Sequence, residues 1–173
     1  MNHRLTKCFG RVILRPLAEK DVELLRLLRN RERKWFIYSE EIDQKTQQLW
    51  FKKYLKTEDD YMFSVSEVKR PDLIIGMVGL YNFNNMEKTC EFGRIVIDQD
   101  TRTEKGLGFD TTVCACKIGF EILGMQRIIL EVFMDNIRAM KTYQKTGFIT
   151  YAKVNGMLKM ELITDKFIIK HSL

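Results

Sequence analysis

Residues suited to binding phosphate lie at positions 103–110, where the sequence reads TEKGLGFD. A glycine lets an anion approach the backbone without a Cβ clash, and the first N–H groups of a helix have no internal acceptor. The stretch lacks the Gly-Lys-Ser/Thr ending of a nucleotide-hydrolysis loop, and a dinucleotide fingerprint needs a small residue at position 111, which is threonine. A phosphate-binding turn and a purely structural turn therefore both remain open.

Hydrophobic periodicity around this turn predicts one α+β domain over residues 1–173. Three consecutive strand patterns within 61–98 indicate an antiparallel meander, whereas strands and helices alternate after the glycine-rich turn. The expected order is β-α-α-β-β-β-α-β-α-β-β. It comprises about seven strands, at 11–16, 61–68, 73–83, 89–98, 127–133, 148–154 and 159–164. About four helices are expected, at 21–30, at 40–56, from the glycine-rich turn to about 123, and at 136–147.

Local patterns give three narrower expectations. The RPD segment at 70–72 is expected to be a turn. The second helix is expected to be anchored by apolar residues, among them Ile42, Leu49 and Trp50. Strand alternation places Glu91, Gly93, Ile95 and Ile97 on one face of their strand.

The composition predicts a cytoplasmic protein with an anionic ligand. The net charge is +6, which suits a nucleotide-like partner, and no Arg/Gly-rich tail is present to indicate nucleic acid. No segment reaches the roughly 18 apolar residues of a membrane span, and residues 1–10 lack the apolar run of a signal peptide. The four cysteines lack metal-site spacing, so we expect no metal, and Cys114 and Cys116 are expected to be buried.

The segments IVIDQDTRTEKGLG (95–108) and DNIRAMKTYQKTGF (135–148) carry a paired pattern. The second contains Asn-x-x-Ala-x-x-x-Tyr-x-x-x-Gly-Phe, as Asn136, Ala139, Tyr143, Gly147 and Phe148. Together the two segments resemble the GNAT superfamily of acetyl-CoA-dependent N-acetyltransferases, whose pyrophosphate loop reads Gln/Arg-x-x-Gly-x-Gly/Ala. Thr103 occupies the Gln/Arg position. The opening RVILRPLAEKDVELL (11–25) is similar to the branch that holds ribosomal-protein, spermidine and amino-sugar N-acetyltransferases.

The resemblance implies the GNAT fold, a mixed central sheet flanked by helices, and acetyl-CoA as co-substrate. It places pantetheine along the strand before the loop, and the acyl group where the strands GRIVID and RIILEVF splay apart. Asn136 also suits a helix N-cap. The residues implied in coenzyme A binding are Ile95, Val96, Ile97, Arg102, Thr103, Lys105, Gly106, Leu107, Gly108, Phe109, Asn136, Ala139 and Tyr143.

Acetyl transfer to an amine needs a base for the amine proton and an acid for the leaving thiolate. The resemblance implies Tyr143 as the acid. It implies Glu91, which opens the strand EFGRIVID, as the base. A tyrosine packed against the sheet and a solvated edge carboxylate are the purely structural alternatives.

The acceptor is expected to be a small-molecule amine, bound by residues of the first two helices, their connection and the middle strands. Aromatic residues beside arginines suit a nucleotide-linked amino sugar, while a polyamine, an aminoglycoside or a protein N-terminus remain alternatives. A non-catalytic coenzyme A-binding or nucleic-acid-binding module is the alternative of another class, and a homodimer is left open. The candidate acceptor residues are Arg29, Asn30, Phe36, Tyr38, Trp50, Tyr81 and Glu91.

Overall fold

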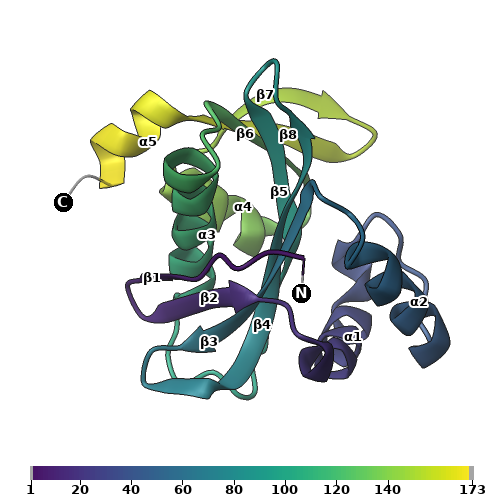
Figure 1. The fold of residues 1–173 in the computed structure, drawn as a ribbon. Helices are drawn as coiled ribbons and strands as arrows, with labels where there is room; N and C mark the ends of the chain where they lie inside the picture. The colour runs from purple at the N-terminus through teal and green to yellow at the C-terminus, as the bar shows by residue number, and fades with distance from the viewer. Residues whose placement is uncertain (1, 172–173) are drawn as a thin grey trace.

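A computed structural model describes residues 2–171, whose strands all join one eight-stranded mixed sheet (Figure 1). The strand order is β1-β2-β3-β4-β5-β6-β8-β7. The strands are β1 (Lys7–Phe9), β2 (Val12–Pro16), β3 (Asp60–Glu67), β4 (Arg70–Asn84), β5 (Thr89–Ile97), β6 (Arg127–Phe133), β7 (Ile149–Val154) and β8 (Met157–Ile163). The helices are α1 (Val22–Arg31), α2 (Gln44–Tyr54), α3 (Leu107–Lys117), α4 (Ile137–Thr146) and α5 (Thr164–His171), and a π-helical segment, Ile118–Ile122, extends α3.

The expected α+β architecture and its antiparallel meander are confirmed, since β3, β4 and β5 pair in succession and antiparallel. Strands β1 and β2 extend the antiparallel part of the sheet. The short strand β1 and the C-terminal helix α5 are additional to the seven strands and four helices expected. Strand β1 spans only three residues, which is too short to show a hydrophobic period. Within residues 2–171, no helix is both long enough and apolar enough to cross a bilayer.

The β3–β4 turn was expected at 70–72, and this is wrong by two residues. Glu67 pairs with Arg70, so the chain reverses at 68–69. The next pair joins Ser66 to Ile74, which leaves 71–73 as a bulge in β4. A bulge tolerates Pro71 because proline has no N–H to give to the ladder.

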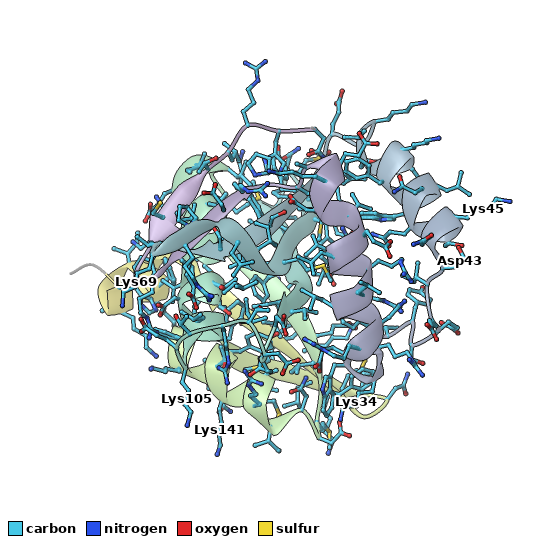
Figure 2. The ribbon with its side chains drawn as sticks, turned by 90° about the horizontal axis from the view of Figure 1, so that it is seen from below. Lys34, Asp43, Lys45, Lys69, Lys105 and Lys141 are labelled. Carbon is cyan, nitrogen blue, oxygen red and sulfur yellow. The ribbon has the colours of Figure 1, made fainter. Side chains whose placement is uncertain are left out.

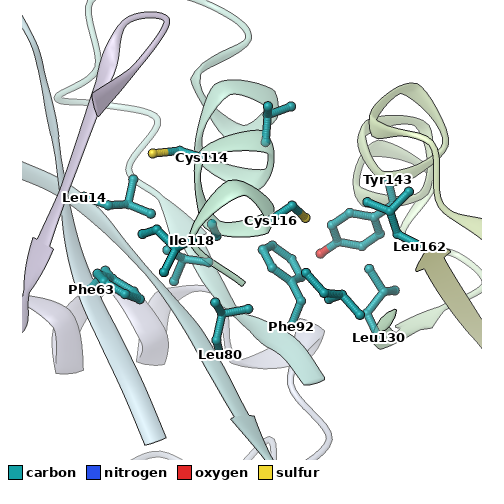
Figure 3. Close-up of a cluster of buried hydrophobic side chains, with 14 of the residues drawn as sticks. Leu14, Phe63, Leu80, Phe92, Cys114, Cys116, Ile118, Leu130, Tyr143 and Leu162 are labelled. Atoms are coloured by element: carbon teal, nitrogen blue, oxygen red, sulfur yellow. The ribbon is translucent and has the colours of Figure 1, made fainter. Parts of the chain in front are cut away.

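The two faces of the sheet carry different helices, with α3 and α4 on one side and α1 and α2 on the other (Figure 1). In α3, every residue from Asp110 to Cys116 is buried. Cys114 and Cys116 are fully buried there, as predicted. Figure 3 shows both side chains among the core residues between α3 and the sheet, with Cys116 beside Phe92 of β5.

Helix α2 packs through Phe51 and Tyr54, which are buried, and Leu49 is 59% exposed. The prediction of Leu49 as an anchor is therefore wrong. The helix begins after Asp43, whose carboxylate accepts the Thr46 N–H at 2.6 Å. With this cap and with α2 packed on α1, the helix face that carries Phe51 and Tyr54 lies against the core. Trp50 is half-buried next to this face.

Candidate active site

Strands β5 and β6 are parallel and paired only over Thr89–Glu91 and Arg127–Ile129. Beyond Glu91 no further pairs join the two strands, in agreement with the splaying that the family resemblance implied. Just past this point β5 contains a bulge: Gly93 pairs with Gly79 and Val96 with Met77, so β5 uses one residue more than β4 between the two pairs. A cavity of about 800 Å³ opens at this divergence, and side chains from β4, β5, β6, α1, α2 and α4 line it.

The bulge also corrects the expected strand alternation. Glu91 and Gly93 share a face with Val96, which packs against the α1–α2 cluster. Ile95 and Ile97 instead pack against the core under α3. The single extra residue reverses the alternation past Gly93, because side chains of a strand change face at every residue.

The cavity wall brings together most of the residues that the sequence indicated. From the acceptor set it contains Arg29, Phe36, Tyr38, Trp50, Tyr81 and Glu91, and from the coenzyme A set Ile95, Val96, Ile97, Gly108, Asn136, Ala139 and Tyr143. Seven others lie outside this wall: Asn30, Arg102, Thr103, Lys105, Gly106, Leu107 and Phe109. Sequence reasoning missed further lining residues, including Glu32, Asn82, Gly93, Arg94, Gln99, Glu131 and Arg138.

Tyr143 reaches the cavity from α4, a helix fixed at both ends by residues of the same signature. The Asn136 side chain accepts the Ala139 N–H at 3.2 Å and caps the helix. Gly147 ends it with a left-handed φ of 118°. The Tyr143 ring packs edge-on against Phe92 and Phe148, with centroids 5.8 and 5.9 Å away. Figure 3 shows it pointing from α4 toward Phe92.

The environment of Tyr143 keeps its hydroxyl group protonated. Burial, followed by the nearby Cys116 thiol, raises the pKa of Tyr143 well above its ordinary value of 10.0. A tyrosine in this state can donate a proton and cannot act as a base near neutral pH. The helix frame and the ring packing therefore deliver a neutral hydroxyl group to the cavity wall.

Glu91 is the last residue of β5 that pairs with β6, and both of its carboxylate oxygens accept hydrogen bonds from side chains of β4. Tyr81 donates its hydroxyl hydrogen to Oε1 at 3.0 Å. Asn82 donates from Nδ2 to Oε2 at 2.8 Å. Asn82 could have been suspected from the sequence, because asparagine in a strand tolerates the left-handed conformation that it adopts here, with φ 52°.

The N-terminus of α3 fits a diphosphate through its backbone. Gly106 caps the helix in a left-handed conformation, φ 87°. Leu107 and Gly108 follow in the first turn, where N–H groups have no intrahelical acceptor. A Cβ added to Gly108 would meet nothing within 4 Å, so the space beside this residue is open to a ligand. The Leu107 side chain is fully buried in the core, so only its backbone can face the ligand.

The side chains just before α3 do not converge on the phosphate-binding turn as its backbone N–H groups do. Thr103 donates its N–H and its hydroxyl group to Glu67. Lys105 is exposed, and Figure 2 shows it projecting outward on the same side of the molecule as Lys141. Arg102 is half-buried. These positions place a positive charge near the loop without building a defined side-chain pocket for the anion.

Arg29 and Asn30 organise the connection between α1 and α2. The Arg29 guanidinium group donates to the carbonyl oxygens of Tyr38 and Glu40, and lies 5.3 Å from the Phe36 ring centroid. Asn30 exchanges two hydrogen bonds with the backbone of Ile42, at 2.8 and 3.0 Å. Both residues therefore fix the segment that carries the cavity's aromatic side chains, and Arg29 also contributes to the wall itself.

Comparisons with known proteins identify the family and the fold. Residues 11–149 match the family model of the acetyltransferase (GNAT) domain. A curated relative, spermidine N(1)-acetyltransferase of Vibrio cholerae serotype O1, is 27% identical over 154 residues, which cover 86% of this chain and 81% of the relative.

Solved structures share the fold. Apo FdhC, a nucleotide-linked sugar GNAT, superposes with a TM-score of 0.84 at 20% identity, over 98% of both chains. Spermidine N-acetyltransferase from Vibrio cholerae, in complex with CoA and spermine, gives a TM-score of 0.80 at 22% identity, over 91% of this chain and 98% of the other. A further structure of the Vibrio cholerae enzyme is dodecameric, with a TM-score of 0.75 at 22% identity over 93% and 98%.

Proposed function

This chain belongs to the GNAT acetyltransferase family, and we propose that it acetylates a primary amine of a small anionic molecule, a nucleotide-linked amino sugar. The main observation that supports this reaction is the position of two side chains. Glu91 and Tyr143 line one cavity at the point where β5 and β6 diverge. Acetyl-CoA, the family's co-substrate, supplies the acetyl group as a thioester when it is bound.

We assign Glu91 the role of base. The acceptor amine is an ammonium ion near neutral pH, and it must lose one proton before its nitrogen lone pair can attack. The Glu91 carboxylate takes that proton, directly or through one water molecule. The amine becomes neutral and the carboxylate becomes a carboxylic acid, so charge and protons balance. Each carboxylate oxygen can accept a further hydrogen bond besides the one it receives from β4.

We assign Tyr143 the role of acid. Cleavage of the thioester leaves a thiolate, which is stabilised when its sulfur receives a proton. The Tyr143 hydroxyl group is kept neutral by burial and is therefore available as the donor. The second proton of the amine nitrogen, released as the amide forms, restores this hydroxyl group, so amide and thiol are both neutral. The N–H groups of Leu107 and Gly108 are assigned to the pyrophosphate of the co-substrate, and Asn136 and Ala139 to its pantetheine arm.

The charge of the cavity favours an anionic acceptor. Arg29 is 9% exposed, and its hydrogen-bond acceptors are the carbonyl oxygens of Tyr38 and Glu40 and the Asn30 amide oxygen. A buried guanidinium group without a carboxylate in direct contact leaves positive charge at the wall. Aromatic side chains surround it and can stack on a nucleobase.

A polyamine is the second candidate, supported by carboxylates in the same wall. Glu32, Glu91 and Glu131 all line the cavity and could attract a cationic chain. Glu131 is already paired with Lys159 at 2.8 Å. Its charge is thus largely balanced, which leaves fewer free carboxylates than a polyamine would use.

A panel of amines tests this assignment. Thiol release and product mass are measured with acetyl-CoA and nucleotide-linked amino sugars, spermidine, an aminoglycoside and a peptide with a free N-terminus. We expect the highest kcat/KM with a nucleotide-linked amino sugar. A preference for spermidine would replace the acceptor but keep the reaction. Failure of millimolar acetyl-CoA to raise the Tm would contradict the enzyme assignment itself.

A further inference from the structure

Two non-glycine residues with left-handed backbone conformations flank Glu91. Asn82 on β4 has φ 52°, and Arg94 on β5 has φ 53°. This conformation is uncommon outside glycine and is strained for a long side chain, so it persists only where the surroundings impose it. The β4–β5 ladder also shifts register on both sides of the Tyr81–Glu91 pair. The irregular backbone is thus concentrated around one cross-strand pair.

At these irregularities, two hydrogen-bond donors, Tyr81 and Asn82, contact the Glu91 carboxylate. Tyr81, directly opposite Glu91, reaches Oε1 with its hydroxyl group at 3.0 Å. The left-handed turn at Asn82 brings its amide to Oε2 at 2.8 Å. In a regular strand, Asn82 would point to the face opposite Tyr81, because successive side chains alternate. The strained residue therefore allows two consecutive side chains to hold one carboxylate.

The Tyr81 ring itself is fixed from two directions. A Cβ on Gly93 would lie 2.3 Å from the Tyr81 hydroxyl oxygen, so the ring needs a glycine beneath it. The Arg94 guanidinium carbon lies 4.0 Å from the ring centroid. Arg94 is in turn bound to both oxygens of Asp60, at 2.7 and 2.8 Å. Ring and guanidinium group together form a rigid support beside the cavity.

We propose that Tyr81 and Asn82 are positioning residues, which hold the Glu91 carboxylate in one orientation toward the acceptor amine. Gly93, Arg94 and Asp60 support Tyr81 in this role. The inference rests on the proposed function, because it takes Glu91 as the base. Tyr81 does not compete for the amine proton: it stays neutral and donates its own hydrogen, and the remaining acceptor positions of Glu91 are left for the amine.

Tyr81→Phe tests the hydroxyl contact while it keeps the ring over Gly93. A hydrogen bond to a charged group contributes enough that its loss should lower kcat about 10-fold. We expect an unchanged Kd for acetyl-CoA, measured by calorimetry, because Tyr81 lies on the acceptor side of the cavity. A fall in kcat without a change in acetyl-CoA affinity separates positioning from a general loss of structure.

Asn82→Gly tests the second donor with a matched control. Glycine adopts the left-handed conformation without strain, so this change removes the amide and keeps the backbone. Asn155, in the β7–β8 turn, has the similar φ of 50°, and Asn155→Gly serves as the control. We expect the Tm to be maintained in both variants. Only Asn82→Gly should lower kcat, again about 10-fold.

Fluorine NMR of the protein labelled with 3-fluorotyrosine reports the contact without acetyl-CoA. The chain has six tyrosines, and the Tyr81 resonance is the one lost in Tyr81→Phe. We expect Glu91→Gln to move this resonance and Asn155→Gly to leave it in place.

The proposal would be overturned if the chemical shift of the Tyr81 resonance were the same in Glu91→Gln and wild type. It would also be overturned if both Tyr81→Phe and Asn82→Gly kept the wild-type kcat. Full activity of Glu91→Gln would instead remove the base assignment of the proposed function. In that case the NMR result still decides whether Tyr81 holds Glu91, so the two failures are distinguishable.

Discussion

The buried carboxylate of Glu67 accepts hydrogen bonds from both the backbone N–H and the hydroxyl group of Thr103, at 2.7 and 2.8 Å. Arg70 donates to the same carboxylate at 3.0 Å and to the Thr101 carbonyl oxygen at 2.6 Å. The tip of the β3–β4 hairpin therefore holds the segment that leads into α3. Thr103 stands where the family resemblance implies Gln or Arg, and both of its donors are engaged by the protein. We infer that backbone N–H groups, rather than this side chain, bind the pyrophosphate.

Glu67→Gln should weaken acetyl-CoA binding. Glutamine offers one acceptor oxygen in place of two, so one Thr103 donor loses its partner and the loop loses its fixed shape. We expect Kd to rise about 10-fold, the value of one hydrogen bond to a charged group. Calorimetry measures this directly. Glu87→Gln, an exposed change in the β4–β5 turn, is the matched control and should keep the wild-type Kd. Equal affinities in the two variants would show that Glu67 does not shape the loop.

The contribution of Glu67 to stability should depend on pH. Burial alone would raise the pKa of Glu67, but the hydrogen bonds from Thr103 and Arg70 bring it below its ordinary value of 4.5. A carboxylate with a lowered folded-state pKa stabilises the fold above its ordinary pKa, and this stability is lost as the pH falls through the folded-state value. The Tm difference between wild type and Glu67→Gln should therefore be present at neutral pH and shrink below pH 4.5. A difference that is constant over this range would contradict the assignment.

Substitution of Gly108 should separate folding from ligand binding. A Cβ at this position meets nothing within 4 Å, so Gly108→Ala fits the folded chain, and it should raise stability by about 0.5 kcal/mol because alanine favours helix more than glycine. The same methyl group enters the space assigned to the pyrophosphate. We expect acetyl-CoA affinity to fall in Gly108→Ala and to be abolished in Gly108→Val. The Tm of the apo protein should rise slightly in Gly108→Ala and be maintained in Gly108→Val. Normal binding by the valine variant would place the pyrophosphate elsewhere.

Tyr143→Phe should remove the proposed proton donor and keep the ring contacts with Phe92 and Phe148. We expect kcat to fall about 100-fold, within the range of general acid catalysis, while the Kd of acetyl-CoA is nearly unchanged. Steady-state kinetics and calorimetry on the same preparation check both parts. Unchanged turnover would remove Tyr143 as the acid.

Arg29→Lys should damage acceptor binding without affecting the co-substrate. A lysine keeps the charge but cannot donate to the Tyr38 and Glu40 carbonyl oxygens with the same planar fork. The aromatic connection before α2 should therefore lose its fixed position, and the acceptor KM should rise about 10-fold. Arg33→Lys, on a half-exposed side chain of the same segment, is the control. A parallel change in acetyl-CoA affinity would mean that Arg29 acts on the whole fold.

Local sequence patterns were sufficient to predict those features that depend on residues close together in the chain. Helix α4 was predicted within one residue of its ends because its cap, Asn136, and its left-handed terminal residue, Gly147, act through hydrogen bonds a few positions away. The faces of α2 could not be predicted in the same way. Leu49 and Phe51 are both apolar, and packing against α1 decides which of them is buried.

The sequence by itself determined the α+β class and the glycine-rich helix start, which are visible in the residue types and their spacing. The family resemblance added Glu91 and Tyr143 as the proposed base and acid. Only the tertiary structure decided how those side chains are held: Tyr81 and Asn82 on Glu91, and Glu67 on Thr103, 36 positions away. Such contacts depend on strand register, and one bulged residue at Arg94 is enough to change it. Register follows from the pairing of two strands together, so neither strand's sequence contains it alone.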